Sequence, residues 1–199
     1  MELYNQTTEY TCAASSLLMI LNHFNKKFSL KKENEFRIWR ESVNLPTRAS
    51  SIYGLAVFAK KEGISVEIVL EESGYDYPDY RFKGYKKVEI ESAEFMSSTF
   101  EKEVKNLAIP VVMKEIDVSD IKELLKEGKI LMVRVNAGIF RDAKSNSQYL
   151  VFKGLTEQGK FIVFDPVSGI LEVDEIQLKE SLDTLHSKKK RDCRMLIFS

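Results

Sequence analysis

The spacing of apolar and polar positions divides the chain into a helical part and a part rich in strands. Apolar residues recur every three or four positions in the first part, which predicts amphipathic helices packed on one side. This spacing is found over residues 12–24, 29–39, 51–63, 92–107 and 119–127. Residues 65–70 alternate instead between apolar and polar positions, and this alternation predicts a strand. The sequence therefore predicts a mostly helical half over about residues 1–128.

The pattern changes in the C-terminal third, where short apolar runs are separated by turns that contain glycine. These runs predict strands over residues 130–135, 149–153, 160–164, 170–173 and 194–198. A helical pattern over residues 175–185 precedes the last strand. Helices first and an antiparallel sheet second is an α+β layout, and 199 residues are enough for one well-buried core. We therefore expect a single α+β domain over residues 1–199, with its sheet half from about residue 129.

The composition and charge of the chain indicate which classes of partner to expect. Thirty basic and 30 acidic side chains leave no net charge, so we expect neither nucleic acid nor a membrane as partner. No apolar run approaches the roughly 18 residues that span a bilayer, and Met1–Tyr4 lacks the features of a signal peptide. We expect a cytoplasmic protein.

The two cysteines, Cys12 and Cys193, stand too far apart for a disulfide framework or a metal-ligand motif, so we expect no metal and no cofactor.

The most informative feature is Cys12, which opens the first predicted helix six residues after Gln6. A thiol at a helix N-terminus meets unpaired backbone N–H groups and the positive end of the helix dipole, and both favour the thiolate. A glutamine a short segment upstream can donate its amide N–H to a developing oxyanion. This arrangement is typical of a papain-type thiol hydrolase.

Four ordered segments, and a dipeptide after them, resemble the bacteriocin-processing (double-glycine leader) cysteine peptidase-like family. The segments are Gln6–Cys12, Ile38–Glu41, Tyr53–Ala56 and Gln148–Gly154, followed by Asp165 and Pro166. They cover nearly the whole chain in the order of the family. They resemble its stand-alone cytoplasmic branch more than the domain that is fused to export transporters. The resemblance implies a papain-like fold, in which a helical half carrying the cysteine packs on the sheet.

The same resemblance implies a role for each matching residue. Cys12 matches the nucleophile, Gln6 the oxyanion donor and Asp165 the aspartate that orients the catalytic base. Gln148 stands where the family usually has the basic histidine, and Ala13 stands where it usually has glycine. A glutamine amide cannot hold a thiolate as an ion pair or return a proton to the departing amine. We therefore expect peptide cleavage to be very slow at best, whereas alkylation of Cys12 could survive.

Of the two histidines in the sequence, His23 is too far along its helix to replace the missing base, and we do not expect His186 to replace it. His23 lies eleven residues along the same predicted helix as Cys12, which is about 16 Å along the helix axis. His186 stands beside the basic run 188–191, where a solvated surface role is the simpler interpretation.

Structural interpretations of the same residues remain open. Cys12 alone could be a small buried apolar side chain, and Asp165 before Pro166 could only begin a turn between two strands. Trp39 is more typical of core packing than of a ligand cage. The tyrosine-rich stretch 75–85 could close over a groove or simply pack against the domain.

Three functional hypotheses follow. The first is a degenerate peptidase-like protein that binds a peptide or protein partner in the cleft without cutting it. The second is an active cysteine peptidase, amide hydrolase or acyl transferase with Cys12 as nucleophile. The third is a structural module whose cysteine is buried and inert. The sequence favours the first, because Gln6, Cys12 and Asp165 are retained while residue 148 is not basic.

Overall fold

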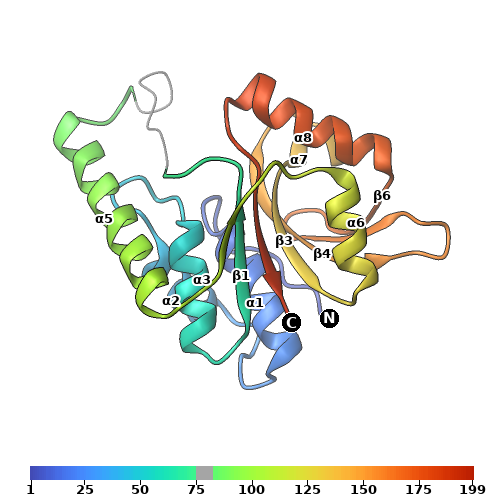
Figure 1. Cartoon of the computed structure of the whole chain (residues 1–199), viewed down its shortest axis with the longest axis horizontal. Helices are drawn as coiled ribbons and strands as arrows, with labels where there is room; N and C mark the ends of the chain where they lie inside the picture. The colour runs from blue at the N-terminus through green and yellow to red at the C-terminus, as the bar shows by residue number, and fades with distance from the viewer. Residues whose placement is uncertain (75–82) are drawn as a thin grey trace.

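The computed structural model of the chain describes residues 1–74 and 83–199, and it combines helices with one mixed sheet (Figure 1). The helices are α1 (Cys12–Phe24), α2 (Lys32–Ser42), α3 (Ile52–Lys61), α5 (Lys87–Asn106), α6 (Val118–Lys126), α7 (Ala137–Phe140) and α8 (Glu175–Lys189). The strands are β1 (Val66–Leu70), β2 (Val111–Met113), β3 (Ile130–Asn136), β4 (Ser147–Leu155), β5 (Phe161–Asp165), β6 (Gly169–Val173) and β7 (Arg194–Phe198). The predicted α+β class is confirmed.

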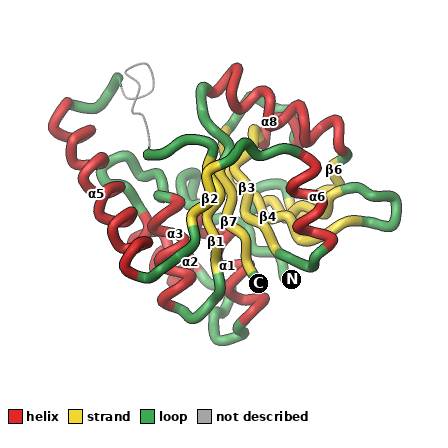
Figure 2. The backbone as a smooth tube through the Cα atoms, viewed as in Figure 1, coloured by secondary structure: helices red, strands yellow, loops and turns green. Residues whose placement is uncertain are grey.

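The strands form one seven-stranded sheet in the order β2-β1-β7-β3-β4-β5-β6 (Figure 2). Every neighbouring pair is antiparallel except β1 and β2, which are parallel. The sheet therefore extends beyond the C-terminal half, because β1 and β2 come from the part of the chain expected to be mostly helical. The apolar pattern predicts β1 but not β2, whose three residues are too few for a period to be recognised.

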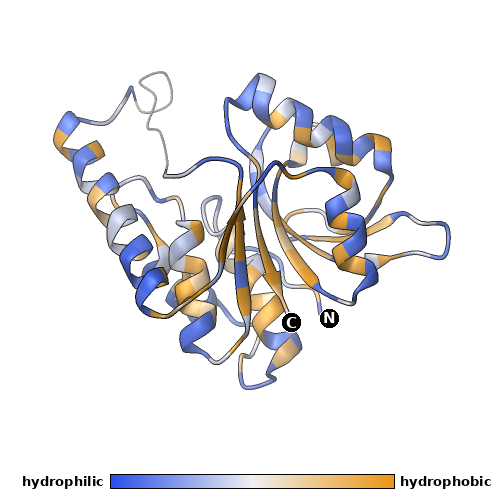
Figure 3. Cartoon of the chain, viewed as in Figure 1, coloured by the Kyte–Doolittle hydropathy of each residue, from blue (hydrophilic) through white to orange (hydrophobic). Residues whose placement is uncertain are grey.

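Both faces of the sheet are covered by helices. One core cluster joins α1, α2, α3 and α5 to one face, and a second cluster joins α6 and α8 to the other face. Met132 and Val133 are neighbours on β3, yet they belong to different clusters, because successive side chains of a strand point to opposite faces. All seven residues of β3 are consequently buried. Figure 3 shows the apolar strands between the two helical layers.

Several element boundaries differ from the predicted ones. Helix α2 begins at Lys32, three residues after the start of the predicted range 29–39. The side chain of Asn34 donates to the carbonyl and hydroxyl oxygens of Ser29. Helix α5 begins at Lys87, five residues earlier than predicted. Helix α8 continues through the basic residues up to Lys189, where Lys190 ends it in the left-handed conformation with φ 50°. Most of the tyrosine-rich stretch lies at residues 75–82, outside the described residues.

Candidate active site

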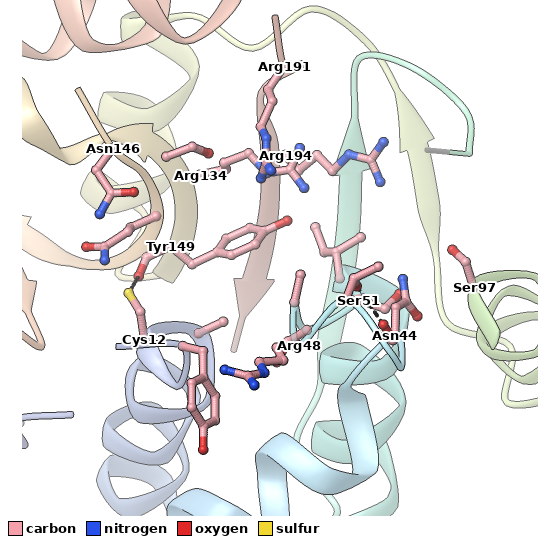
Figure 4. Close-up of a pocket in the computed structure, with 18 of the residues that line it drawn as sticks. Cys12, Asn44, Arg48, Ser51, Ser97, Arg134, Asn146, Tyr149, Arg191 and Arg194 are labelled. Carbon is pink, nitrogen blue, oxygen red and sulfur yellow. Dashed lines mark hydrogen bonds between the residues drawn. The ribbon is translucent and has the colours of Figure 1, made fainter. Parts of the chain in front are cut away.

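Cys12 is the first residue of α1 and lines a pocket of about 310 Å³ (Figure 4). Its side chain is almost buried, with 6% exposure. The thiol donates a hydrogen bond to the carbonyl oxygen of Tyr149 on β4, with a distance of 3.3 Å between sulfur and oxygen. Ser16, one helical turn later, donates its hydroxyl to the same carbonyl at 2.8 Å. These two bonds hold the N-terminus of α1 against β4.

The protonation state of Cys12 follows from its surroundings. The pKa of the thiol is raised to about 12, mainly by burial and also by the negative charge of Asp165. The positive charge of Arg141 and the hydrogen bond to Tyr149 act in the opposite direction without cancelling this rise. The helix N-terminus does favour the thiolate, but the loss of hydration outweighs that effect. At neutral pH the sulfur is therefore a thiol, and it donates a hydrogen bond to a carbonyl oxygen.

Asp165 and Gln148 meet at the side chain of Arg141, in the loop after α7. Asp165 is completely buried at the end of β5. Nε and Nη2 of Arg141 donate to its two carboxylate oxygens at 2.7 and 2.6 Å. The same Nη2 donates to Oε1 of Gln148 at 2.5 Å, and the backbone N–H of Val167 donates to Asp165 at 2.8 Å. The carboxylate predicted to orient a base is thus held by a guanidinium.

Gln6 lies in the segment before α1 and is tied to the turn that follows Asp165. Its backbone N–H donates to the carbonyl oxygen of Pro166 at 3.0 Å. Its side-chain amide donates to the carbonyl oxygen of Thr8 at 2.8 Å, so one of its two amide donors is used within its own loop. Oε1 of Gln6 is buried and has no hydrogen-bond partner among the described residues.

Glu35 of α2 anchors the segment that carries Gln6. It is completely buried, and its two carboxylate oxygens accept from the backbone N–H and hydroxyl of Thr7 at 2.9 and 2.7 Å. The hydroxyls of Tyr4 and Ser15 also donate to it, at 3.0 and 2.9 Å. Burial raises the pKa of Glu35, but hydrogen bonds from Thr11, Thr7 and Ser15 together bring the pKa below its ordinary value. An ionised, satisfied carboxylate therefore links the loop before α1 to α1 and α2.

The structure brings the sequence-predicted residues into one region, but with different surroundings. Cys12 and Gln148 both line the pocket, and Asp165 is near enough to Cys12 to influence its pKa. The two histidines lie elsewhere. His23 is in the last turn of α1, and His186 of α8 is within 2.6 Å of a carboxylate oxygen of Glu71. Neither is among the described residues that line the pocket.

Arg141 and Glu35 are among the residues of this region that sequence reasoning missed. Arg141 stands in an irregular loop, where no period or motif marks it. Its presence could have been inferred only indirectly. If Asp165 is buried and the usual histidine is missing, another cation has to pair with it, because buried charges are paired. Glu35 lies on a polar-looking helix among other charged residues, and the pattern gives no sign that it is buried.

Within the described residues, no three histidine, cysteine, aspartate or glutamate side chains are grouped closely enough to hold a metal ion. Nor does any helix in residues 1–74 and 83–199 have the length and apolar character required to cross a membrane.

Together, a mixed sheet and a cysteine at a helix N-terminus facing a pocket are features of a protein related to cysteine peptidases. A model of the Peptidase C39-like family matches residues 1–191. The chain belongs to this family, because the match spans nearly all of it. No curated protein matches the chain in the corresponding comparison.

Proposed function

We propose that this Peptidase C39-like protein is catalytically degenerate and binds a peptide or protein segment in the pocket beside Cys12 without cleaving it. The observation that carries the proposal is the position of Arg141, which holds both the carboxylate of Asp165 and the amide of Gln148. In a working thiol peptidase an imidazole would be needed between that carboxylate and the sulfur.

The chemistry of the sulfur supports the same proposal. With a pKa of about 12, only about one thiol in 100,000 is ionised at pH 7. Arginine cannot take the proton, since its guanidinium stays charged under all ordinary conditions. Gln148 has no proton to exchange either. Among the described residues of this site, we find none that could form the nucleophile or protonate a leaving amine.

The pocket itself supports a binding role. A volume of about 310 Å³ is at the lower end of the range for sites that hold small ligands, and it suits a short peptide segment. Its wall combines the almost buried Cys12 with polar side chains from β4 and from the loop between α2 and α3. We also propose that the protein belongs to the stand-alone cytoplasmic branch of the family. This part of the proposal is supported by the sequence segments that resemble that branch.

Incubation with a peptide library of mixed sequence tests the proposal. We expect peptides to be retained by the protein at equilibrium, with no cleavage products in the mass spectrum after long incubation. The Cys12→Ala variant is expected to retain the same peptides, because a binding role does not require the sulfur. Cleavage products that disappear in Cys12→Ala would support the alternative, an active cysteine peptidase, amide hydrolase or acyl transferase.

A further inference from the structure

We propose that the pocket beside Cys12 recognises a carboxylate group of its peptide ligand, through a set of arginines and the hydroxyl of Tyr149. This inference rests on the proposed function and specifies the chemistry of the ligand.

The first observation is the charge of the pocket wall. The described residues that line the pocket include Arg48, Arg134, Arg191 and Arg194, and a single acidic residue, Glu9. Figure 4 shows Arg134, Arg191 and Arg194 gathered on one side of the Tyr149 ring, with Cys12 on the other side. Asp192, which pairs with Arg134 and Arg194, balances part of this charge. Four arginines against the carboxylates of Glu9 and Asp192 still make a concave wall that attracts anions. Guanidinium groups also match the planar shape of a carboxylate, to which they can donate two parallel hydrogen bonds.

The second observation is that two of these arginines are held rigidly. Arg134 of β3 and Arg194 of β7 are both nearly buried, with 6% and 4% exposure. They share the carboxylate of Asp192, which lies 3.0 Å from Nη1 of Arg134 and 2.6 Å from Nε of Arg194. Arg194 also donates to the carbonyl oxygen of Gly74. Donors that are fixed before a ligand arrives bind it with a smaller loss of conformational entropy.

The third observation is independent of charge. The hydroxyl of Tyr149 is buried and has no hydrogen-bond partner among the described residues, although the residue is only 7% exposed. Ser147 lies two positions earlier on β4 and also lines the pocket. Its hydroxyl is likewise buried and has no hydrogen-bond partner among the described residues. Buried hydroxyls without partners are rare because they lose their hydrogen bonds to water. An acceptor oxygen supplied by a ligand would satisfy them.

Tyr149 also fixes the position of the carboxylate relative to Cys12. Its backbone carbonyl accepts the hydrogen bond from the sulfur, and the guanidinium of Arg134 lies over its ring, 5.2 Å from the ring centre. One tyrosine side chain therefore spans the distance between the Cys12 end and the arginine end of the pocket (Figure 4). The carboxylate then belongs to a residue one or two positions from the residue that contacts Cys12. It is either the C-terminal carboxylate of a peptide or the side chain of an aspartate or glutamate.

A library of N-acetylated tripeptides tests this inference, prepared once with free C-terminal carboxylates and once as C-terminal amides. The peptides retained by the protein at equilibrium are separated by ultrafiltration and quantified by mass spectrometry. Because a hydrogen bond to a charged group contributes more than a neutral one, we expect about tenfold stronger retention of the carboxylate-bearing peptides. Preference for free acids identifies the C-terminus as the source. Preference for amides that contain aspartate or glutamate identifies the side chain.

Three variants link the preference to the pocket. Tyr149→Phe removes only the unpartnered hydroxyl, and Arg191→Gln removes one charge from the wall. Arg40→Gln removes a charge from an exposed position of α2 and serves as the matched control. We expect the carboxylate preference to fall toward unity in the first two variants and to stay unchanged in the control. Because the hydroxyl has no partner, Tyr149→Phe is expected to unfold at the same temperature as the unmodified protein.

The outcomes separate this inference from the proposed function. Equal retention of acids, amides and acidic peptides would overturn the carboxylate site and leave peptide binding intact. Retention of no peptide at all would overturn both. A loss of preference in Tyr149→Phe that is accompanied by a lower unfolding temperature would assign the hydroxyl a structural role and contradict the inference.

Discussion

Arg141 and Asp165 form a two-point ion pair, in which the two nitrogens of the guanidinium donate to the two oxygens of one carboxylate. The pair is shielded from water, since the side chain of Arg141 is 12% exposed and that of Asp165 is completely buried. Arginine cannot lose its proton, so the positive charge beside the pocket is permanent. A histidine in the same place would have supplied a charge that can be switched.

Replacement of Arg141 should therefore affect folding as well as the site. Arg141→Met leaves the carboxylate of Asp165 buried without a cation, and we expect a loss of about 3 kcal/mol in the free energy of unfolding. The double variant Arg141→Met with Asp165→Asn should be less destabilised than the sum of its single variants, because no charge is then left alone. Urea denaturation of all four proteins measures the coupling. Strict additivity would show that the ion pair contributes nothing specific.

The same pair determines what a restored histidine can do. In Gln148→His the new imidazole would face Arg141, whose charge opposes protonation of the ring, so we expect the pKa of Cys12 to stay high. Adding Arg141→Met frees Asp165 to bind the imidazole and should lower the pKa of Cys12. Ultraviolet absorbance of the thiolate as a function of pH measures both variants. An equal fall in the single and double variants would show that Arg141 does not block the site.

The raised pKa of Cys12 also predicts slow alkylation. At pH 8 we expect iodoacetamide to modify Cys12 in the native protein at least about a hundredfold more slowly than in the urea-unfolded chain. Peptide mapping distinguishes Cys12 from Cys193, which is also buried with a raised pKa. Comparable rates in the native and unfolded protein would mean that the sulfur is exposed and ionised in solution.

The raised pKa of Cys12 also makes the stability of the fold depend on pH. The unfolded thiol ionises near its ordinary pKa of about 8.5, whereas the folded thiol ionises at about 12. Deprotonation therefore favours the unfolded chain across this interval, and the native protein should lose stability as the pH rises through it. Cys12→Ser, whose hydroxyl does not ionise in that range, should lose less stability between neutral and alkaline pH. Parallel slopes of stability against pH would contradict the assignment.

Glu35 makes the opposite prediction on the acidic side. Its lowered pKa means that its stabilising effect is fully present above the ordinary pKa of glutamate and is lost as the pH falls through the folded value. Glu35→Gln should therefore be less stable than the unmodified protein at neutral pH, by about 1–3 kcal/mol. The difference should shrink as the pH falls below the ordinary pKa of glutamate, about 4.3. Glu33→Gln, at an exposed position of the same helix, is the control and should change little.

Gly138 tests how the loop that carries Arg141 is supported. A Cβ atom at Gly138 would lie 2.6 Å from the carbonyl oxygen of Lys144 and 2.8 Å from that of Ala143, which is closer than atoms can approach. Gly138→Ala should displace this loop and cost about 1–3 kcal/mol. Gly154→Ala is the matched control, because nothing lies within 4 Å of its Cβ position. Equal stability of the two variants would show that the loop adapts freely.

Most of the helices and strands could be predicted, because their apolar periods are strong. Leu17, Leu18 and Leu21 lie on one amphipathic stretch, and α1 occupies the range that their spacing indicates. Strand β2 and helix α7 were missed, because three or four residues are too few for a period. The start of α5 was missed because Lys87 and Glu89 alternate with Val88 and Ile90 there, and this alternation is not a helical pattern. Sequence periodicity indicates which side of an element is apolar. It gives no signal where an element is short or exposed to solvent.

Less of the candidate site than of the fold could be predicted from the sequence. The positions of Cys12, Gln6 and Asp165 could be inferred from motifs that keep their order in the sequence. Their surroundings could not, because the pKa of Cys12 depends on burial and on charges from distant parts of the chain. Arg141 lies 24 residues from the aspartate it binds, in a loop whose path is set by the packing of α7. Such contacts are properties of the folded chain and leave no local pattern.

The place of β7 between β1 and β3 has a consequence for how the molecule assembles. In the described sheet, residues 194–198 lie between a pair of strands from the first 113 residues and a four-stranded meander from residues 130–173. Both neighbours of this strand come earlier in the chain, so the sheet becomes continuous only when the last strand pairs with β1 and β3. Arg191 and Arg194 arrive with it, so the arginine wall is completed last, when the rest of the architecture is already in place.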